Sequence, residues 1–117
     1  MKVLGTCAAL MALPMALSAQ DTLDVTSLTY RCERNVMVPV TFINLPEGPA
    51  LAVMQIEGKQ IALRALPSGS GVRYVGFDEQ DSYRLYTKGD GAFVMHMAAD
   101  HTAEEVPVLG DCSVANQ

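Results

Sequence analysis

From Ser27 onwards, short runs of alternating apolar and polar residues are separated by turn-forming residues. An alternation of period two is typical of strands that bury one face, and turns about every 8–12 residues are typical of antiparallel sandwiches and barrels. The preceding residues, 20–26, are polar and are predicted to be a frayed or extended lead-in. No segment of the mature chain has a clear helical pattern. We predict about eight strands: 28–33, 36–43, 51–56, 60–66, 72–77, 82–87, 92–98 and 106–112.

The strand pattern indicates an all-β fold, a small antiparallel β-barrel. Eight strands can close on themselves and leave no edge exposed. Pro39 cannot donate to a strand ladder, so we expect an edge or a bulge at that position. The chain has no tryptophan. Its core must therefore be built from smaller apolar residues with a few Phe and Tyr, and is too small to enclose a roomy ligand cavity as well.

The first nineteen residues read as a secretory signal peptide. Lys2 supplies the positive charge, residues 3–17 are mostly apolar, and Leu17-Ser18-Ala19 offers small residues for cleavage. The apolar run is too short and broken for a stable membrane span, which needs about 20 residues. We predict a signal peptide over residues 1–19, a single domain over 20–117, and no membrane insertion.

Of the three cysteines, two fall in the predicted mature chain. Cys32 and Cys112 most simply pair in an oxidising compartment, and the bond would fasten the first strand to the last. Two free buried thiols are the alternative. The sequence does not favour a lipid anchor on Cys7, because Thr6 is a poor residue before it and only six residues precede it.

The mature chain is predicted to be acidic. The full sequence has eight basic and thirteen acidic residues. Loss of Lys2 with the signal would leave seven basic residues and a net charge of −6. Such a domain is a poor nucleic-acid binder, because phosphate contacts need Lys and Arg. It is suited to a basic protein partner, whose approach its field would accelerate.

Two segments carry the candidate binding chemistry, residues 68–74 and 83–89. Ser70 lies between two glycines, which leave its hydroxyl uncrowded and allow a positive φ. Lys88 directly precedes Gly89-Asp90-Gly91, a turn signal between two strands. If the two strands are neighbours, the hydroxyl and the ammonium project from one end of the sheet, where a scaffold can present them to a partner.

Enzyme and metal chemistry are less well supported. Ser68 stands where a nucleophile elbow needs its first glycine, and Ser70 would need His96 or His101 beside it. Two histidines without a third soft ligand lack the usual zinc spacing. The acidic run 78–81 is too short for a calcium loop and is interpreted as a hairpin turn. Thr87-Lys88-Gly89 lacks the upstream glycines of a phosphate loop. We predict no enzyme, no metal and no cofactor.

Four motifs in a fixed order carry a family resemblance. They are Tyr30-Arg31-Cys32-Glu33, Ser70-Gly71-Val72-Arg73-Tyr74, Tyr83-Arg84-Leu85-Tyr86-Thr87-Lys88-Gly89-Asp90, and Cys112. Together they resemble the MliC/PliC family, bacterial inhibitors of c-type lysozyme, over about residues 28–112.

This resemblance implies an eight-stranded barrel that inserts Ser70 and Lys88 into the lysozyme cleft as a competitive block. Tyr74 and Tyr86 are equally candidates for the barrel core, and Arg73 and Tyr74 are expected to hold the loop rather than touch the enzyme. The candidate lysozyme-binding residues are Ser70, Lys88, Gly71, Arg73, Tyr74, Thr87 and Gly89.

The resemblance also bears on location. Membrane-bound members begin with a lipidated cysteine, and Cys7 is badly placed for that role, so the chain is expected to be soluble in the periplasm after signal cleavage. The alternative function is a small-ligand-binding barrel of the cell envelope, which would require an apolar cavity open to solvent. The sequence assigns no role to the loop over residues 44–49 and leaves a homodimer open.

Overall fold

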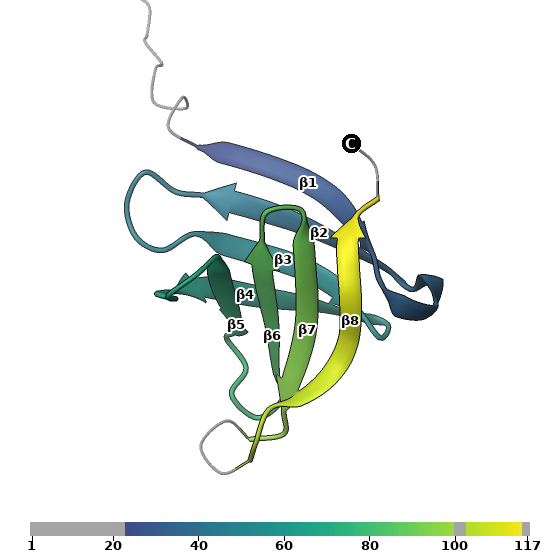
Figure 1. Cartoon of the computed structure of the whole chain (residues 1–117). Helices are drawn as coiled ribbons and strands as arrows, with labels where there is room; N and C mark the ends of the chain where they lie inside the picture. The colour runs from purple at the N-terminus through teal and green to yellow at the C-terminus, as the bar shows by residue number, and fades with distance from the viewer. Residues whose placement is uncertain (1–22, 100–102, 116–117) are drawn as a thin grey trace, which may run out of the picture.

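The structure, a computed structural model, describes residues 23–99 and 103–115. Eight antiparallel strands close into a barrel in chain order, as predicted (Figure 1). The predicted signal peptide, residues 1–19, and His101 lie outside the described residues. The strands are β1 (Asp24–Arg31), β2 (Met37–Asn44), β3 (Leu51–Ile56), β4 (Lys59–Leu66), β5 (Val72–Gly76), β6 (Ser82–Lys88), β7 (Gly91–Met97) and β8 (Val106–Val114).

Helical structure is almost absent from the described part of the chain. One 3₁₀ turn, η2 (Glu33–Asn35), joins β1 to β2. No helix within residues 23–99 and 103–115 is long and apolar enough to cross a membrane.

For the last three residues of the predicted lead-in, residues 20–26, the extended alternative holds and the frayed one is wrong. β1 begins at Asp24, because Asp24 to Thr26 continue the ladder with β2 as far as Asn44. Ser27 Oγ and Thr41 Oγ1 also lie 2.9 Å apart across the two strands. The polar residues of this region therefore form a strand by pairing rather than by burial.

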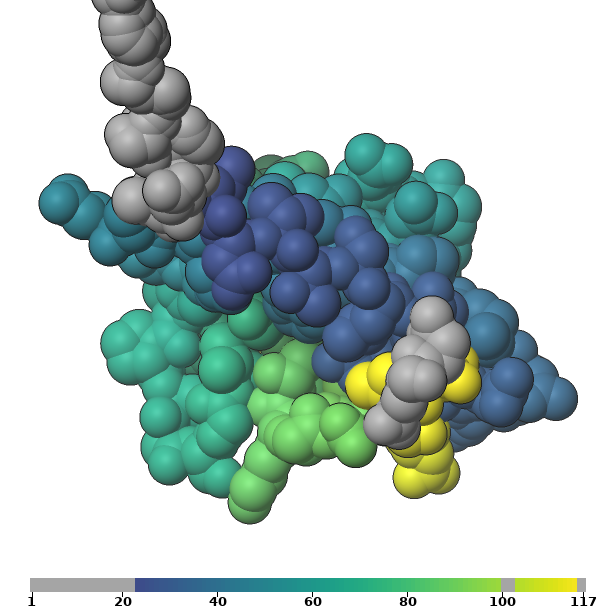
Figure 2. All heavy atoms as spheres, turned by 90° about the horizontal axis from the view of Figure 1, so that it is seen from above, coloured from purple at the N-terminus to yellow at the C-terminus, as the bar shows by residue number. Residues whose placement is uncertain are grey.

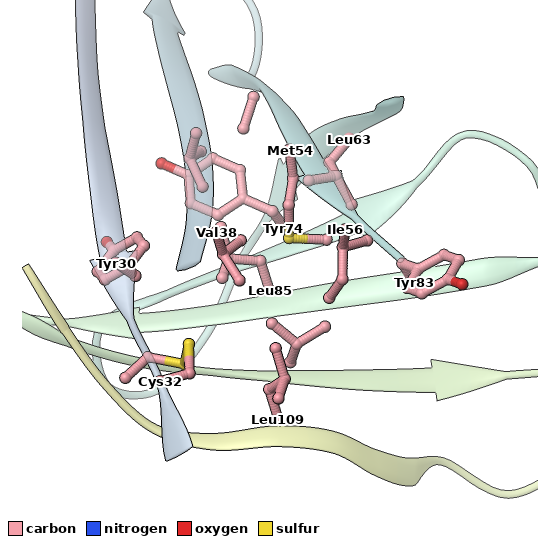
Figure 3. Close-up of a cluster of buried hydrophobic side chains, with 14 residues drawn as sticks. Tyr30, Cys32, Val38, Met54, Ile56, Leu63, Tyr74, Tyr83, Leu85 and Leu109 are labelled. Atoms are coloured by element: carbon pink, nitrogen blue, oxygen red, sulfur yellow. A yellow bond between two sulfur atoms is a disulfide. The ribbon is translucent and has the colours of Figure 1, made fainter. Parts of the chain in front are cut away.

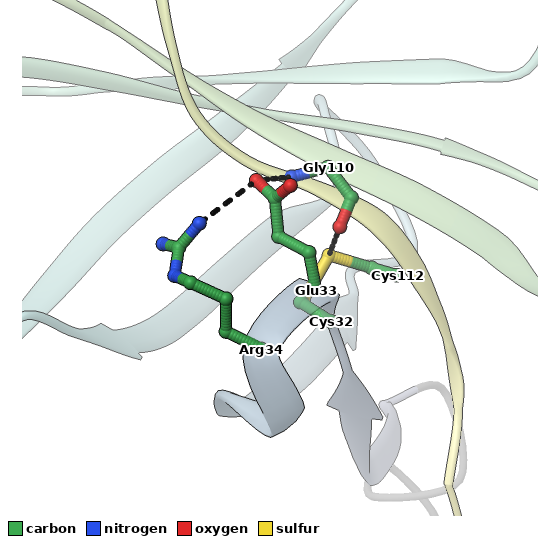
Figure 4. Close-up of a disulfide and its surroundings, with 5 residues drawn as sticks. All are labelled: Cys32, Glu33, Arg34, Gly110 and Cys112. Atoms are coloured by element: carbon green, nitrogen blue, oxygen red, sulfur yellow. Dashed lines mark hydrogen bonds and ion pairs between the residues drawn. A yellow bond between two sulfur atoms is a disulfide. The ribbon is translucent and has the colours of Figure 1, made fainter.

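The barrel closes through a short seam between β1 and β8. Only two residue pairs, Tyr30 with Val114 and Arg31 with Ser113, join these strands. The predicted Cys32–Cys112 disulfide is confirmed beside the seam and links residues 80 positions apart. The Gly110 N–H donates to Glu33 Oε2 at 2.8 Å close to the disulfide (Figure 4). A covalent bond and a side-chain hydrogen bond thus reinforce a short ladder.

Inward-facing residues from all eight strands fill the barrel interior (Figure 3). The side chains of Met54, Leu63 and Leu85 are fully buried, and the predicted alternation places them on the inner face. The buried cluster comprises Tyr30, Cys32, Val38, Val40, Ala52, Met54, Ile56, Leu63, Tyr74, Tyr83, Leu85, Val94, Leu109 and Cys112.

Pro39 lies at the expected free edge. It is opposite Thr29 of β1, but the ladder between β2 and β3 begins only at Val40. A proline has no N–H to continue that ladder. The two strands therefore part beyond Val40.

Candidate functional site

The two segments singled out in the sequence lie at one end of the barrel. β5 and β6 are adjacent, and their ladder reaches from Val75–Arg84 to Val72–Thr87. The β4–β5 loop and the β6–β7 turn therefore come out at the same end, which confirms that the two strands are neighbours. Figure 2 looks onto this end, where the light green β6–β7 tip and the teal β4–β5 loop reach the surface.

Ser70 and Lys88 share a shallow hollow of about 300 Å³. Both residues are exposed, and neither is covered by the barrel to which it belongs. Both residues thus contribute to one rim that is open to a partner. The hollow is lined by Ser70, Tyr86, Thr87, Lys88, Gly91, Ala92 and Phe93.

Gly71 makes this approach possible. Its φ is +69°, in the left-handed region that favours glycine, and a Cβ added there would lie 2.1 Å from the Thr87 carbonyl oxygen. The same Cβ would lie 3.1 Å from the Cβ of Lys88. Ser68 Oγ donates to the Ser70 carbonyl at 3.1 Å and supports the loop from within. The loop can lie against the β6 tip only because residue 71 has no side chain.

Gly71→Ala is expected to weaken partner binding about tenfold or more, which corresponds to about 1.4 kcal/mol. The added methyl group clashes with rigid backbone, so the loop must move and Ser70 must leave the neighbourhood of Lys88. Gly69→Ala is the matched control, because a Cβ at Gly69 meets nothing within 4 Å. Equal partner-binding curves for the two variants would contradict this role of Gly71.

The other candidate residues support the tip in different ways. Tyr74 is buried in the core with its ring centroid 5.4 Å from that of Phe42, which confirms the core interpretation for Tyr74. The same interpretation was wrong for Tyr86, whose half-buried side chain lies on the outer face of β6, because it alternates with the inward-facing Leu85. Burial raises the pKa of Tyr74 above its ordinary value. Thr87 Oγ1 donates to the Val72 carbonyl at 3.5 Å, and Gly89 takes a φ of +59° in the turn.

Arg73 faces Tyr86 across the β5–β6 ladder. Burial raises the pKa of Tyr86, and the Arg73 guanidinium near its hydroxyl offsets part of that rise. The Nε of Arg73 is buried and has no hydrogen-bond partner among the described residues. Arg73 therefore lies beside the site, where the sequence analysis expected it to hold the loop.

Sequence reasoning missed two residues near the site, Phe93 and Glu105. Phe93 forms a stacked pair with Tyr86, and Glu105 accepts hydrogen bonds from Tyr86 and Arg84. The sequence signal for Phe93 was its outward position opposite Tyr86 in the hairpin register. Glu105 had no such signal, because it belongs to a polar segment predicted to be irregular.

The opposite end of the barrel holds a second polar cluster. Lys59 Nζ donates to Asp81 Oδ2 at 2.8 Å, and His96 Nε2 lies 2.7 Å from Asp81 Oδ1. The Tyr83 hydroxyl donates to Glu57 Oε1 at 2.6 Å. These contacts tie the β3–β4 hairpin and the β5–β6 loop to β7. His96 is thus a strand residue in a structural network far from Ser70.

Asp81→Asn is expected to lower the free energy of unfolding slightly at neutral pH and to flatten its fall in acid. Hydrogen bonds from Lys59 and His96 hold the pKa of Asp81 below its ordinary value of 3.8. The associated stability is therefore complete above that value and is lost as the pH falls through the lower, folded-state pKa. The effect is small because the pair is largely exposed.

Denaturant unfolding at neutral and acid pH measures this effect. Glu79→Gln is the matched control, since it removes an exposed acid from the same loop. An Asp81→Asn profile that follows the parent at every pH would contradict the assignment.

A larger hollow of about 670 Å³ also lies at this opposite end. It opens where β2 and β3 part beyond Val40, and its floor includes the buried Val38, Ile56 and Leu109. Arg34, Glu57 and Lys59 give it a charged lining. The hollow is separate from the one that Ser70 and Lys88 share.

The fold and the site together define a small, disulfide-closed barrel that presents polar groups on turn tips. Residues 30–103 match the family model MliC, described as membrane-bound lysozyme-inhibitor of c-type lysozyme. The chain belongs to this MliC family. Its members are inhibitor proteins, in agreement with the prediction that the chain is not an enzyme. No curated protein matches the chain.

Two solved structures are similar to the chain. One is PliC-St, the periplasmic lysozyme inhibitor of C-type lysozyme from Salmonella typhimurium, with 30% identity and a TM-score of 0.68. The match covers 80% of this chain and 100% of PliC-St. The other is Pseudomonas aeruginosa MliC, solved in complex with hen egg white lysozyme. It is 24% identical with a TM-score of 0.58, and the match covers 92% of this chain and 96% of that one. The second likeness supports the fold.

Proposed function

We propose that this protein is a periplasmic inhibitor of c-type lysozyme, and that Ser70 and Lys88 enter the active-site cleft of the enzyme. The observation that carries the proposal is the exposure of both residues on one hollow at one end of the barrel. Membership of the MliC family supplies the class of partner. The β4–β5 loop and the β6–β7 turn take their shape from Gly71, Thr87 and Gly89. They are supported on the barrel side by Arg73 and Tyr74.

The chemistry of the cleft suits these two groups. A lysozyme cleaves its glycan with two carboxyl groups that flank the scissile bond. The Lys88 ammonium would form a charge-assisted contact with an ionised carboxylate. The Ser70 hydroxyl can donate to a carboxylate or accept from a carboxylic acid. Both groups would occupy the place of the sugar, so the inhibition is competitive.

The charge of the protein supports the same partner. The full chain carries a formal net charge of −5, and all thirteen acidic residues follow the predicted signal peptide. An acidic body accelerates the approach of a basic enzyme such as a c-type lysozyme.

The proposed location rests on the sequence and on one relative. PliC-St is described as periplasmic, and the matched family is described as membrane-bound. The signal peptide over residues 1–19 would export the chain. The position of Cys7 favours a soluble domain, residues 20–117, over a lipid-anchored one.

A lysis assay tests the function directly. The purified mature protein is expected to inhibit c-type lysozyme on bacterial cell walls and to leave g-type and i-type lysozymes active. The inhibition should be overcome by excess substrate, because the block is competitive. Undiminished c-type activity at saturating protein would refute the proposal.

A second candidate function is a small-ligand-binding barrel, which the hollow of about 670 Å³ favours. The filled barrel interior counts against it, because the buried cluster occupies the space that an enclosed ligand would need. Titration with an apolar fluorescent probe would test it. Saturable binding that survives Lys88→Ala would support a separate ligand site.

A further inference from the structure

An aromatic pair forms one wall of the hollow that Ser70 and Lys88 share. Phe93 of β7 lies opposite Tyr86 of β6 in the hairpin register, and both side chains are on the outer face. Their rings stack with centroids 4.7 Å apart and an interplanar angle of 7°. Phe93 is 44% exposed, so a large apolar surface faces solvent directly beside an ammonium group.

The hydroxyl group of Tyr86 is fixed by a carboxylate. Its hydroxyl lies within hydrogen-bond distance of both Glu105 carboxylate oxygens, at 2.9 and 2.7 Å. Burial and this carboxylate raise the pKa of Tyr86 above its ordinary value. Tyr86 therefore stays neutral and keeps its proton as the donor in this contact.

The carboxylate itself is anchored to β6. Glu105 accepts from Arg84 Nη1, and Arg84 Nε donates to Ser82 Oγ at 2.9 Å. Arg84 and Ser82 are buried although they point away from the barrel interior. Glu105 thus lies over the outer face of β6 and fixes the ring on which Phe93 stacks.

We propose that the stacked Tyr86–Phe93 pair is the apolar anchor of the interface with c-type lysozyme. This inference rests on the proposed function and adds residues to its site. Exposed aromatic side chains on rigid supports dominate many interfaces, because they bury a large area at a low entropic cost. Contact through Phe93 would also exclude water from the neighbouring Lys88 and strengthen its charge-assisted contact. Glu105 acts as a positioning residue through Tyr86.

The test compares two exposed phenylalanines. Phe93→Ala is expected to raise the inhibition constant for c-type lysozyme roughly tenfold, the loss typical of an interface anchor. Phe77→Ala is the matched control, because Phe77 is 52% exposed at the opposite end of the barrel and also packs on one side chain, Arg64. Phe93→Leu provides a second variant that keeps apolar bulk and should lose less.

The role of Glu105 needs a readout that a general loss of stability would not move. Glu105→Gln should weaken inhibition in the parent but have little further effect in Phe93→Ala, because the ring that it positions is then gone. The same loss in both backgrounds would remove Glu105 from the anchor.

The outcomes separate this inference from the proposed function. If the parent inhibits, Lys88→Ala inhibits poorly and Phe93→Ala matches the parent, the anchor is overturned and the function stands. If Phe93→Ala and Phe77→Ala lose equally, the anchor is also overturned. If the parent does not inhibit, the function and the anchor both fail.

Discussion

Lys88→Ala is expected to weaken inhibition of c-type lysozyme about thirtyfold or more, since truncation of an interface hot spot costs about 2 kcal/mol or more. Lys88 is exposed at the hairpin tip and lines the hollow with Ser70. Among the described residues that line the hollow, Lys88 is the only one with a cationic side chain. A titration of lysozyme inhibition measures the change.

The control for this variant is Arg31→Ala. Arg31 is exposed on β1 and its removal changes the net charge by the same amount, so it tests for a purely long-range electrostatic effect. Ser70→Ala should cost less than Lys88→Ala, and the double variant should approach inactivity. A Lys88→Ala protein as potent as the parent would refute the assignment of the site, and full inhibition by the double variant would move the site elsewhere.

Replacing Cys32 and Cys112 by serine is expected to cost up to about 4–5 kcal/mol of unfolding free energy, because the disulfide closes a loop across most of the domain. The bond links residues 80 positions apart. The seam that it fastens has only two residue pairs between β1 and β8. This loss is comparable to the whole stability of a small domain, which is about 5–15 kcal/mol.

Denaturant unfolding with and without a reductant measures the contribution of the disulfide. The unfolding free energy of the parent should fall when the reductant is added. That of the double serine variant should be the same with and without the reductant, which controls for side effects of the reductant. An unfolding midpoint of the serine variant equal to that of the oxidised parent would show that the seam and the Glu33–Gly110 hydrogen bond close the barrel unaided.

Most of the strand pattern could be predicted because burial imposes a period of two. Met54, Leu63 and Leu85 fall on the inner face, as the alternation required. The same rule failed at the start of β1, where Asp24 and Thr26 pair with β2 although they are polar and exposed. Strand pairing there depends on the neighbouring strand, and no local pattern encodes it.

The site was only partly predictable for the same reason. The turn signals around Ser70 and Lys88 are local, and so is the register that makes β5 and β6 neighbours. The clamp of Glu105 on Tyr86 joins residues 19 positions apart and requires the chain to return over the outer face of β6. The Asp81–Lys59 pair spans 22 positions and depends on which loops share one end of the closed barrel.

By itself the sequence determined the all-β barrel, the pairing of Cys32 with Cys112 and the two tips that carry Ser70 and Lys88. Alternation and glycine-containing turns act over a few residues, and the disulfide follows because only two cysteines remain after the predicted signal peptide. Only the tertiary structure decided that Gly71 brings the two tips onto one hollow and that Phe93 stands exposed beside them. Those arrangements arise from closure of the barrel, which sets distances between side chains that the local pattern leaves free.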